Sequence, residues 1–386
     1  MNIKGDRKMQ TNHFFKMVFS VWLLIFLATA PGFSQKVKIE EKDGIIIIRN
    51  PKKPVKVPGA PKAIVLEEDL RIGIEEGDED YMFANLRSVQ VDDEENIYVL
   101  DAKFIKVRVY DKNGRHIRSF GKFGQGPGEC QWPSRMYMRS DGKIAILDSP
   151  GRRFSYYSKE GECLKEIRLA KHGLVIRAWP DSQGFVYCDI LDLSEASRKT
   201  KLIKFDAEFN RVSEIAELEE KRNLMEINPI FYRIVYNVLP DDRLIWAKNL
   251  EYCIHVVDAS GKLVKKIYKD YVPVSIPEAE KERIKKERYS DGFPPSLKLV
   301  FPKKYPAIYY FLSDEKGRIY VRTYTQNKEG LLKWDVFDEE GRYILSFFHP
   351  EEDILFTIKN GKIYSINQDN EEGLPHVRRY RIVWQR

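Results

Sequence analysis

Short runs of apolar residues, each ended by a turn, follow one another along most of the chain. Asn96–Leu100 is apolar and aromatic and stops at Asp101. In Val107–Tyr110 the valines alternate with the other residues, which is the period of a strand with one buried face. Asp111–Gly114 then supplies asparagine and glycine, which tolerate the positive φ of a tight hairpin turn, and His116–Phe120 continues as the next strand. Short strands separated by such turns predict an all-β fold.

This pattern recurs along the chain. Each copy has a turn, an apolar strand, a gap, an aromatic strand that ends near an aspartate, and a glycine. Later copies start at Gly142, Gly184, Arg243, Gly317 and Gly361. Six units of four strands, repeating about every 40 to 50 residues, predict a six-bladed β-propeller of four-stranded antiparallel blades. A pair of irregular β-sandwiches is the alternative, and it is disfavoured because sandwiches do not repeat one turn signature in this way.

The best-formed copy resembles a known repeat. The strand IYVLD that ends at Asp101, the hairpin VRVYDKNG and the connection FGKFGQGPGECQWP are similar to NHL-type repeats. The chain as a whole, over roughly residues 40–386, resembles the six-bladed β-propeller proteins that are abundant in exported form in Bacteroidetes and related bacteria. This resemblance implies a fold, and it implies little chemistry because the family name describes a shape.

The N-terminal residues have the pattern of a secretory signal. A basic start is followed by the apolar run Met17–Ala30, and Gly32 and Ser34 supply small residues before Gln35. The apolar run is shorter than the roughly 20 residues of a membrane span, which is the alternative reading. We therefore expect a signal peptide at residues 1–34, a closing strand with a proline-rich crossing segment at residues 35–80, and a propeller at residues 81–386. The mature protein would be secreted or periplasmic, without a stable membrane span.

Two segments depart from the repeat. Gly44–Asn50 is strongly β-prone and the last unit lacks one strand, so we expect this N-terminal strand to join the last blade and close the ring, as it does in the resembled family. In Tyr271–Pro306, Ser275 and Pro277 can start a helix and Glu278–Arg288 is helix-prone. The sequence therefore predicts a helical insertion near residues 271–306, which either carries specificity or covers an edge.

Composition excludes few function classes. Removing residues 1–34 from the 386-residue chain leaves 61 basic and 57 acidic residues, a net charge of +4 with both signs interspersed. This balance gives no sign of nucleic-acid binding. Four cysteines follow no metal-binding spacing, and we expect free thiols, with one disulfide bridge as the alternative. They are Cys130, Cys163, Cys188 and Cys253.

Catalytic motifs are missing from the sequence. Gly124–Gly128 is glycine-rich, but Trp132 and Pro133 follow it where a phosphate loop needs a helix N-terminus. No serine-hydrolase elbow is present, and no two of the six histidines have the spacing of a zinc helix. Among the predicted inner strands only Asn85, Asp353 and Asn237 offer suitable oxygen ligands, whereas Ca²⁺ takes six to eight. We therefore predict no cofactor, with Ca²⁺ as the alternative.

Arginine recurs at the predicted inner strands, as Arg87, Arg135, Arg177 and Arg233. A ring of guanidinium groups would suit a carboxylate or sulfate ligand. These four lie at odd and even offsets from the next strand, so strict alternation would send them to opposite faces unless bulges intervene. Further candidate ligand-binding residues lie on the connections or near the channel: Lys103, Phe104, Trp132, Asp148, Arg152 and Asp353.

The sequence thus favours a binding protein over an enzyme. We expect an exported, non-catalytic and monomeric propeller scaffold that binds a protein, peptide or glycan, with an anionic ligand among the options, on one face of the ring. The alternative is a lyase or lactonase-like hydrolase that uses a divalent cation at the channel mouth. A third hypothesis is an adhesive or structural module without any small-molecule site.

Overall fold

The computed structural model describes residues 36–139, 141–148, 153–194, 197–221, 223–289, 293–294, 296–368 and 374–385. Within these ranges Val37–Arg386 form one compact unit, and the predicted signal peptide at residues 1–34 lies outside the described residues. No helix in the described ranges has the length and apolarity to cross a membrane.

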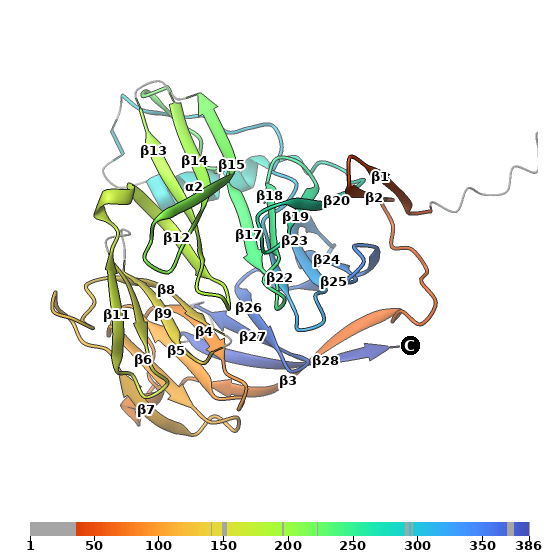
Figure 1. The fold of residues 1–386 in the computed structure, drawn as a ribbon. Coiled ribbons are helices and arrows are strands. Elements are labelled where there is room, and N and C mark those ends of the chain that lie inside the picture. The colour runs from red at the N-terminus through yellow and green to blue at the C-terminus, as the bar shows by residue number, and fades with distance from the viewer. Residues whose placement is uncertain are drawn as a thin grey trace, which may run out of the picture. The chain divides into compact units, whose positions relative to one another are not determined.

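Six β-sheets form the blades of this unit (Figure 1). Five of them contain four strands that are consecutive in the sequence, and the sixth combines three C-terminal strands with one N-terminal strand. The first blade contains β4 (Leu86–Val91), β5 (Ile97–Asp101), β6 (Lys106–Tyr110) and β7 (His116–Phe120). The second contains β8 (Pro133–Met138), β9 (Ile144–Asp148), β10 (Arg153–Tyr157) and β11 (Cys163–Arg168). The third contains β12 (Leu174–Pro180), β13 (Val186–Leu193), β14 (Ser197–Phe205) and β15 (Arg211–Lys221).

The other three blades follow the same plan. The fourth contains β17 (Ile234–Val238), β18 (Leu244–Lys248), β19 (Cys253–Val257) and β20 (Leu263–Lys269). The fifth contains β22 (Tyr310–Ser313), β23 (Ile319–Gln326), β24 (Leu332–Phe337) and β25 (Tyr343–His349). The sixth contains β26 (Asp353–Lys359), β27 (Lys362–Asn367), β28 (His376–Gln385) and the N-terminal strand β3 (Ala63–Ile72).

The first strand of each blade lies at the centre of the ring. β4, β8, β12, β17, β22 and β26 each contact the next inner strand, and β26 contacts β4 again. The inner strands therefore form a closed circle around a central channel, as the repeat pattern predicts. The fold is a six-bladed β-propeller, which confirms the predicted fold class.

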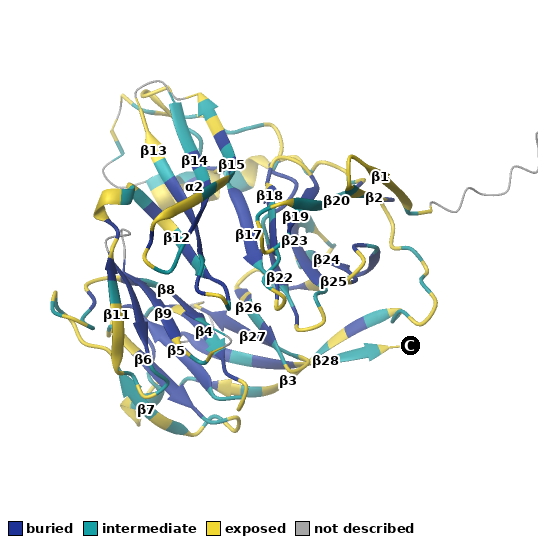
Figure 2. Cartoon of the chain, viewed as in Figure 1, coloured by how far each residue is buried: buried dark blue, intermediate teal, exposed yellow. Residues whose placement is uncertain are grey.

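The hydrophobic core lies between neighbouring blades rather than at the channel. Six apolar clusters fill the six interfaces between neighbouring blades, with one cluster at each interface. The sixth interface completes the circle, where Tyr364 and Ile366 pack with Val89 and Val99. Figure 2 shows the buried residues along the middle of the blades and the exposed ones at their connections and outer strands. Each sheet buries one of its faces against the preceding blade and the other against the following blade, so closing the ring also completes the core.

An N-terminal strand closes the ring, but it is a different strand from the one predicted. β3 pairs antiparallel with β28 from Ile72↔Val377 to Ala63↔Gln385 and supplies the outer strand of the sixth blade. Figure 1 shows these two strands, from opposite ends of the chain, side by side. The prediction that Gly44–Asn50 joins the last blade is wrong. That segment forms β2 (Ile45–Asn50), which pairs parallel with β20 of the fourth blade.

β2 and its hairpin partner β1 (Lys38–Lys42) extend the fourth blade outward. Ile48 is buried in the cluster between the fourth and fifth blades. The Asn50 side chain is 2% exposed, donates to the carbonyl of Gly341 at 2.9 Å and accepts from the amide of Tyr343 at 2.8 Å. These contacts hold the two blades together. A run of isoleucines fits a half-buried strand on the fourth blade as well as one on the last blade. The sequence alone therefore does not show which of the two blades this strand joins.

The predicted helical insertion is present. α2 (Glu278–Tyr289) follows Pro277, and Ile284 packs in a small apolar cluster with Ile230 and Ile276. The two-stranded parallel ladder of β16 (Glu226–Ile227) and β21 (Lys298–Leu299) ties the insertion to the connection before the fourth blade. Two short 3₁₀ helices, η1 (Glu79–Tyr81) and η2 (Ala170–His172), precede the first and third blades.

The four cysteines are free thiols in the structure, as the sequence favours. Cys163 is exposed, whereas Cys130, Cys188 and Cys253 are buried. Burial raises the pKa of the Cys130 thiol to about 11. None of the four has the electropositive, accessible surroundings of a reactive cysteine.

His255 in the fourth blade makes folding stability depend on pH. Its ring stacks on Trp246 with centroids 4.1 Å apart, and burial, together with nearby Lys266, lowers its pKa from 6.5 to about 4. The unfolded chain therefore takes up a proton below pH 6.5 that the folded chain does not accept until about pH 4. We expect stability to fall by about 1–3 kcal/mol across that window.

The variant His255→Phe keeps the stacked ring and removes the titration. We expect urea unfolding of this variant, followed from pH 7 to pH 4, to have a flatter pH dependence than that of the wild type. Equal slopes for both proteins would show that His255 does not set this dependence.

Candidate functional site

One end of the central channel opens into a cavity of about 300 Å³. It lies where the inner strands begin, and all six inner strands contribute to its lining. Arg87, Arg135, Arg177 and Arg233 lie together in this lining, although they come from or immediately precede four different inner strands. We call the cavity the arginine pocket and this side of the ring the arginine face.

Three β-bulges explain how the arginines reach one cavity. A bulge gives one strand an extra residue and re-aims the side chains that follow. Arg87 is itself the extra residue in β4, while Arg135 in β8 and Arg177 in β12 follow directly after the extra residues Ser134 and Ile176. Strict alternation, which predicts opposite faces for these side chains, fails at these positions.

Two of the arginines are held by hydrogen bonds to described residues, and two are not. Arg177 makes an ion pair with Asp189 at 2.8 Å and donates to the carbonyl of Ile234 at 2.6 Å. Arg233 donates to the carbonyl of Tyr309 at 2.9 Å, and its buried Nε has no hydrogen-bond partner among the described residues. The guanidinium groups of the other two, Arg87 and Arg135, are exposed and make no hydrogen bond or ion pair with the described residues.

The arginine pocket is electrostatically positive. Its described lining holds four arginines and no aspartate or glutamate. Asp189, the carboxylate that pairs with Arg177, is 3% exposed and also accepts a hydrogen bond from the hydroxyl of Tyr236. Asp189 and Tyr236 together raise the pKa of Arg177 despite its burial, so this guanidinium stays charged. Such a pocket attracts an anion, because arginine offers several donors in a fixed plane to a carboxylate or sulfate.

Four tyrosines complete the polar surface of the pocket, and one of them carries an unused hydroxyl. Tyr137 is 3% exposed, and its hydroxyl has no hydrogen-bond partner of good geometry among the described residues. Burial raises the pKa of Tyr137 to about 12, against the opposing effect of Arg135 and Arg177. The hydroxyl is therefore protonated and available to donate or accept. The other three are Tyr236, Tyr309 and Tyr310.

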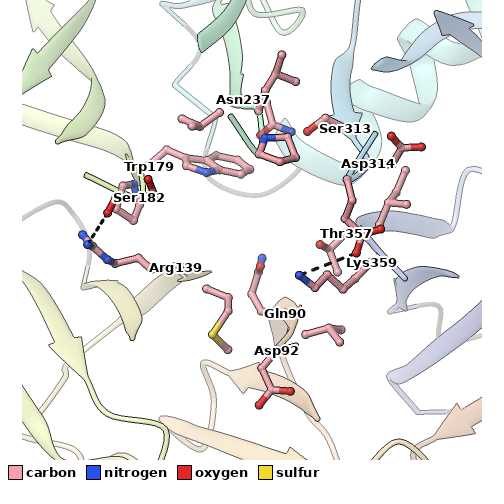
Figure 3. A pocket seen from close by; sticks show the side chains of 18 of the residues that line it. Gln90, Asp92, Arg139, Trp179, Ser182, Asn237, Ser313, Asp314, Thr357 and Lys359 are labelled. Atoms are coloured by element: carbon pink, nitrogen blue, oxygen red, sulfur yellow. Dashed lines mark hydrogen bonds and ion pairs between the residues drawn. The ribbon is translucent and has the colours of Figure 1, made fainter. Parts of the chain in front are cut away.

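The opposite end of the channel has the reverse charge. A second cavity of about 260 Å³ lies there, and six carboxylates and three basic side chains line it. Figure 3 shows this cavity, with Gln90, Trp179, Asn237 and Thr357 from four inner strands around a common space. Trp179 and Gln90 line both cavities, as do Leu312 and Phe356, so these four side chains separate the two halves of the channel.

Three other residues predicted from the sequence lie on connections at the arginine face but outside the pocket lining. Lys103 and Phe104 are exposed between β5 and β6, and Trp132 is exposed just before β8. Phe104 lies under the guanidinium of Arg108, 5.1 Å from its ring centroid. These side chains therefore lie on two neighbouring blades at the arginine face.

The two aspartates among the candidates are structural. Asp148 is buried, accepts from the amides of Gln131 and Trp132 and pairs with Arg153 at 3.4 Å. It holds the connection that leads into β8. Arg152, the neighbouring candidate, lies outside the described residues.

Asp353 is 2% exposed and does not line either half of the channel. It accepts from His349 at 2.9 Å and from the hydroxyl of Tyr380 at 2.5 Å. Burial raises the pKa of the Asp353 carboxyl. The hydrogen bonds from His349 and Tyr380, with the nearby hydroxyl of Ser365, outweigh this effect and lower the pKa below its usual value of 3.8. Its place at the first residue of β26 suggested a channel position, but its side chain faces the interior of the sixth blade.

Sequence reasoning missed the tyrosines and Trp179. These residues lie in inner strands that read as ordinary β-prone segments, since aromatic residues are common in strands. One signal was present: a tyrosine or tryptophan follows within three residues of an arginine in three of these strands, at Tyr137, Trp179 and Tyr236. Among the described residues, no group of three or more histidine, cysteine, aspartate or glutamate side chains is placed to hold a metal ion.

Comparisons with known proteins support the fold. Residues 76–267 match a family model described as a 6-bladed beta-propeller. The structure is similar to a protein from Bacteroides fragilis NCTC 9343 that is named as a presumed exported protein, with 15% identity, a TM-score of 0.55, and coverage of 87% of this chain and 99% of that chain. It is also similar to a DUF4221 family member from Bacteroides vulgatus ATCC 8482, with 11% identity, a TM-score of 0.51, and coverage of 84% and 99%.

These identities are low, so the two structures show a shared fold and no shared activity. No curated protein gives a significant sequence match to the chain. The ring of six blades shows that the chain has the six-bladed β-propeller fold, and the family model that matches residues 76–267 describes the same fold.

Proposed function

We propose that this protein is an exported, non-catalytic propeller scaffold that binds an anionic ligand in the arginine pocket. The observation that carries the proposal is the convergence of four arginines from four blades in a described lining without any carboxylate. Four guanidinium groups of like charge repel one another around this cavity, and two of them are exposed with unused donors, so an anionic occupant is favoured. The N-terminal pattern of residues 1–34 supports export.

The surroundings of the pocket also suit binding. Four exposed aromatic residues lie on connections at the arginine face, and a fifth, Phe348, lies on an outer strand. Large exposed aromatic side chains near arginine are typical of binding surfaces. The four on the arginine face are Phe104, Phe123, Trp132 and Phe231.

The two exposed arginines provide the sharpest test. We expect D-galacturonate, measured by titration calorimetry, to bind, and neutral D-galactose to bind far more weakly, because only the acid presents a carboxylate. Arg87→Gln and Arg135→Gln should each weaken galacturonate binding about tenfold, the equivalent of one charge-assisted hydrogen bond. The melting temperature should stay nearly unchanged, since neither guanidinium makes a hydrogen bond or ion pair with the described residues and Arg135 lies 5.8 Å from the ring centroid of Phe356, a distance at which a cation–π contact at an exposed site is weak.

The matched control replaces two arginines that are exposed and lie outside the pocket, Arg115→Gln together with Arg168→Gln. This control removes the same charge and should leave binding unchanged. Equal binding of galactose and galacturonate, or wild-type affinity in an Arg87→Gln, Arg135→Gln double variant, would overturn the proposal.

A further inference from the structure

A second positively charged cavity, of about 320 Å³, opens beside the arginine pocket. It lies between the fourth and fifth blades, and the chain segments that line it are Val272–Val274 after β20, Ala307 before β22 and Thr323–Thr325 in β23. These segments lie at the same end of their blades as the start of the inner strands, so the cavity belongs to the arginine face.

Four lysines and a single carboxylate line this cavity, which we call the lysine pocket. Lys269 is 6% exposed, and its ammonium lies 3.3 Å from Asp335 and 4.9 Å from the ring centroid of Tyr252. Lys333 lies 3.0 Å from the other oxygen of Asp335. Lys52 and Lys53, on the segment after β2, are exposed and have no side-chain partner among the described residues. The described lining thus holds four lysines and one carboxylate, so the pocket keeps an excess of positive charge.

The two pockets share one wall. Tyr309 lines the arginine pocket, and the guanidinium of Arg233 lies 4.8 Å from its ring centroid. Tyr324 lines the lysine pocket, and its ring meets that of Tyr309 edge to face at 5.3 Å. Two tyrosine rings in contact therefore lie between two cationic cavities on one face. A ligand that crosses this pair of rings can place one anionic group in each cavity.

We propose that the arginine pocket and the lysine pocket are consecutive subsites for an acidic oligosaccharide. This inference rests on the proposed function. Hydroxyl-bearing residues line both cavities, and several of their hydroxyls make no hydrogen bond of good geometry with the described residues: Tyr137 and Tyr309 in the first cavity, and Tyr271, Tyr324 and Thr325 in the second. Hydroxyl-rich walls suit a ligand that carries a hydroxyl on most carbons between its acidic groups, whereas an acidic peptide would offer amides and mainly apolar carbon there.

The length of the saccharide and the charge of the lysine pocket distinguish a site with two subsites from binding in the arginine pocket alone. We expect tetragalacturonate to bind about a hundredfold more tightly than galacturonate, because the second contact becomes intramolecular once the first has formed. The double variant Lys52→Gln, Lys53→Gln should lose most of this gain while it binds galacturonate with wild-type affinity. Both lysines are exposed, so folding should be unaffected. The matched control is Lys112→Gln, Lys316→Gln, which removes two exposed lysines on turns at the opposite face.

Each outcome decides between the two proposals. Loss of galacturonate binding in the arginine variants, with no gain from chain length and no effect of the lysine variants, would overturn the second subsite and leave the arginine pocket in place. Full binding of tetragalacturonate by the arginine variants would overturn the proposed function. A tetra-glutamate peptide that binds as tightly as tetragalacturonate, with the same dependence on Lys52 and Lys53, would show that the ligand class is wrong.

Discussion

Replacing Asp335 by asparagine is expected to destabilise the protein by about 3–5 kcal/mol, because it removes a buried carboxylate that pairs with the ammonium groups of Lys269 and Lys333. Asp335 is 1% exposed and accepts from the hydroxyls of Tyr252 at 2.8 Å and Tyr343 at 2.7 Å. It also faces the ammonium groups of Lys269 and Lys333. Asparagine fits the same space, so the expected loss reflects charge and hydrogen bonding rather than a cavity.

Urea unfolding at neutral pH measures this loss. The matched control is Asp241→Asn, which breaks an ion pair with Arg243 in which the aspartate side chain is 54% exposed, and exposed pairs contribute about 0–1 kcal/mol. Adding Lys269→Met to Asp335→Asn should recover part of the stability, because it removes the more deeply buried of the two unpaired ammonium groups. A cost below about 1 kcal/mol for Asp335→Asn would show that the lysines do not depend on this carboxylate.

Deleting residues 36–72 should abolish the cooperative unfolding of the ring, whereas deleting residues 36–61 should only lower its melting temperature. The longer deletion removes β3 and leaves β28 as an open edge. It also removes Ile64 and Ile72, both buried, and loss of such side chains costs about 2–5 kcal/mol each. The shorter deletion removes β1 and β2 but keeps all six blades complete.

Circular dichroism and calorimetry on the two truncated chains distinguish these outcomes. A synthetic peptide covering residues 62–73, added to the longer deletion, should restore a cooperative transition by pairing with β28. A reversed-sequence peptide of the same composition is the control. If both truncated chains melt alike, ring closure does not depend on β3, and the N-terminal segments contribute only through local packing.

The repeat and its turns were visible in the sequence because they are local. Strand alternation and turn residues depend on neighbours a few positions apart, so the six blades, their inner strands and the helix α2 follow from patterns such as that of residues 96–120. The arginines of the inner strands were visible for the same reason. Their common cavity was not, because it depends on bulges in β4, β8 and β12, and the sequence gives no local signal for them.

The identity of the strand that closes the ring could not be predicted from local sequence patterns either. Residues 44–50 and 63–72 are both β-prone, and the isoleucine run made the first of them the stronger candidate. Which strand reaches β28 depends on the length of the intervening segment and on side-chain pairs such as Asp69 with Arg379 and Glu67 with Arg381, more than 300 residues apart. Pairing across that separation is set by the ring as a whole.

The fold, the blade order, the helical insertion and the arginines at four inner strands could all be predicted from local sequence patterns. Three features depend on how the blades come together: which strand closes the ring, the shared cavity of the four arginines with no carboxylate in its described lining, and the position of Lys52, Lys269 and Lys333 in the neighbouring cavity. The physical reason is that backbone pattern is encoded over a few residues, whereas a binding cavity is made where segments from separate blades approach one another.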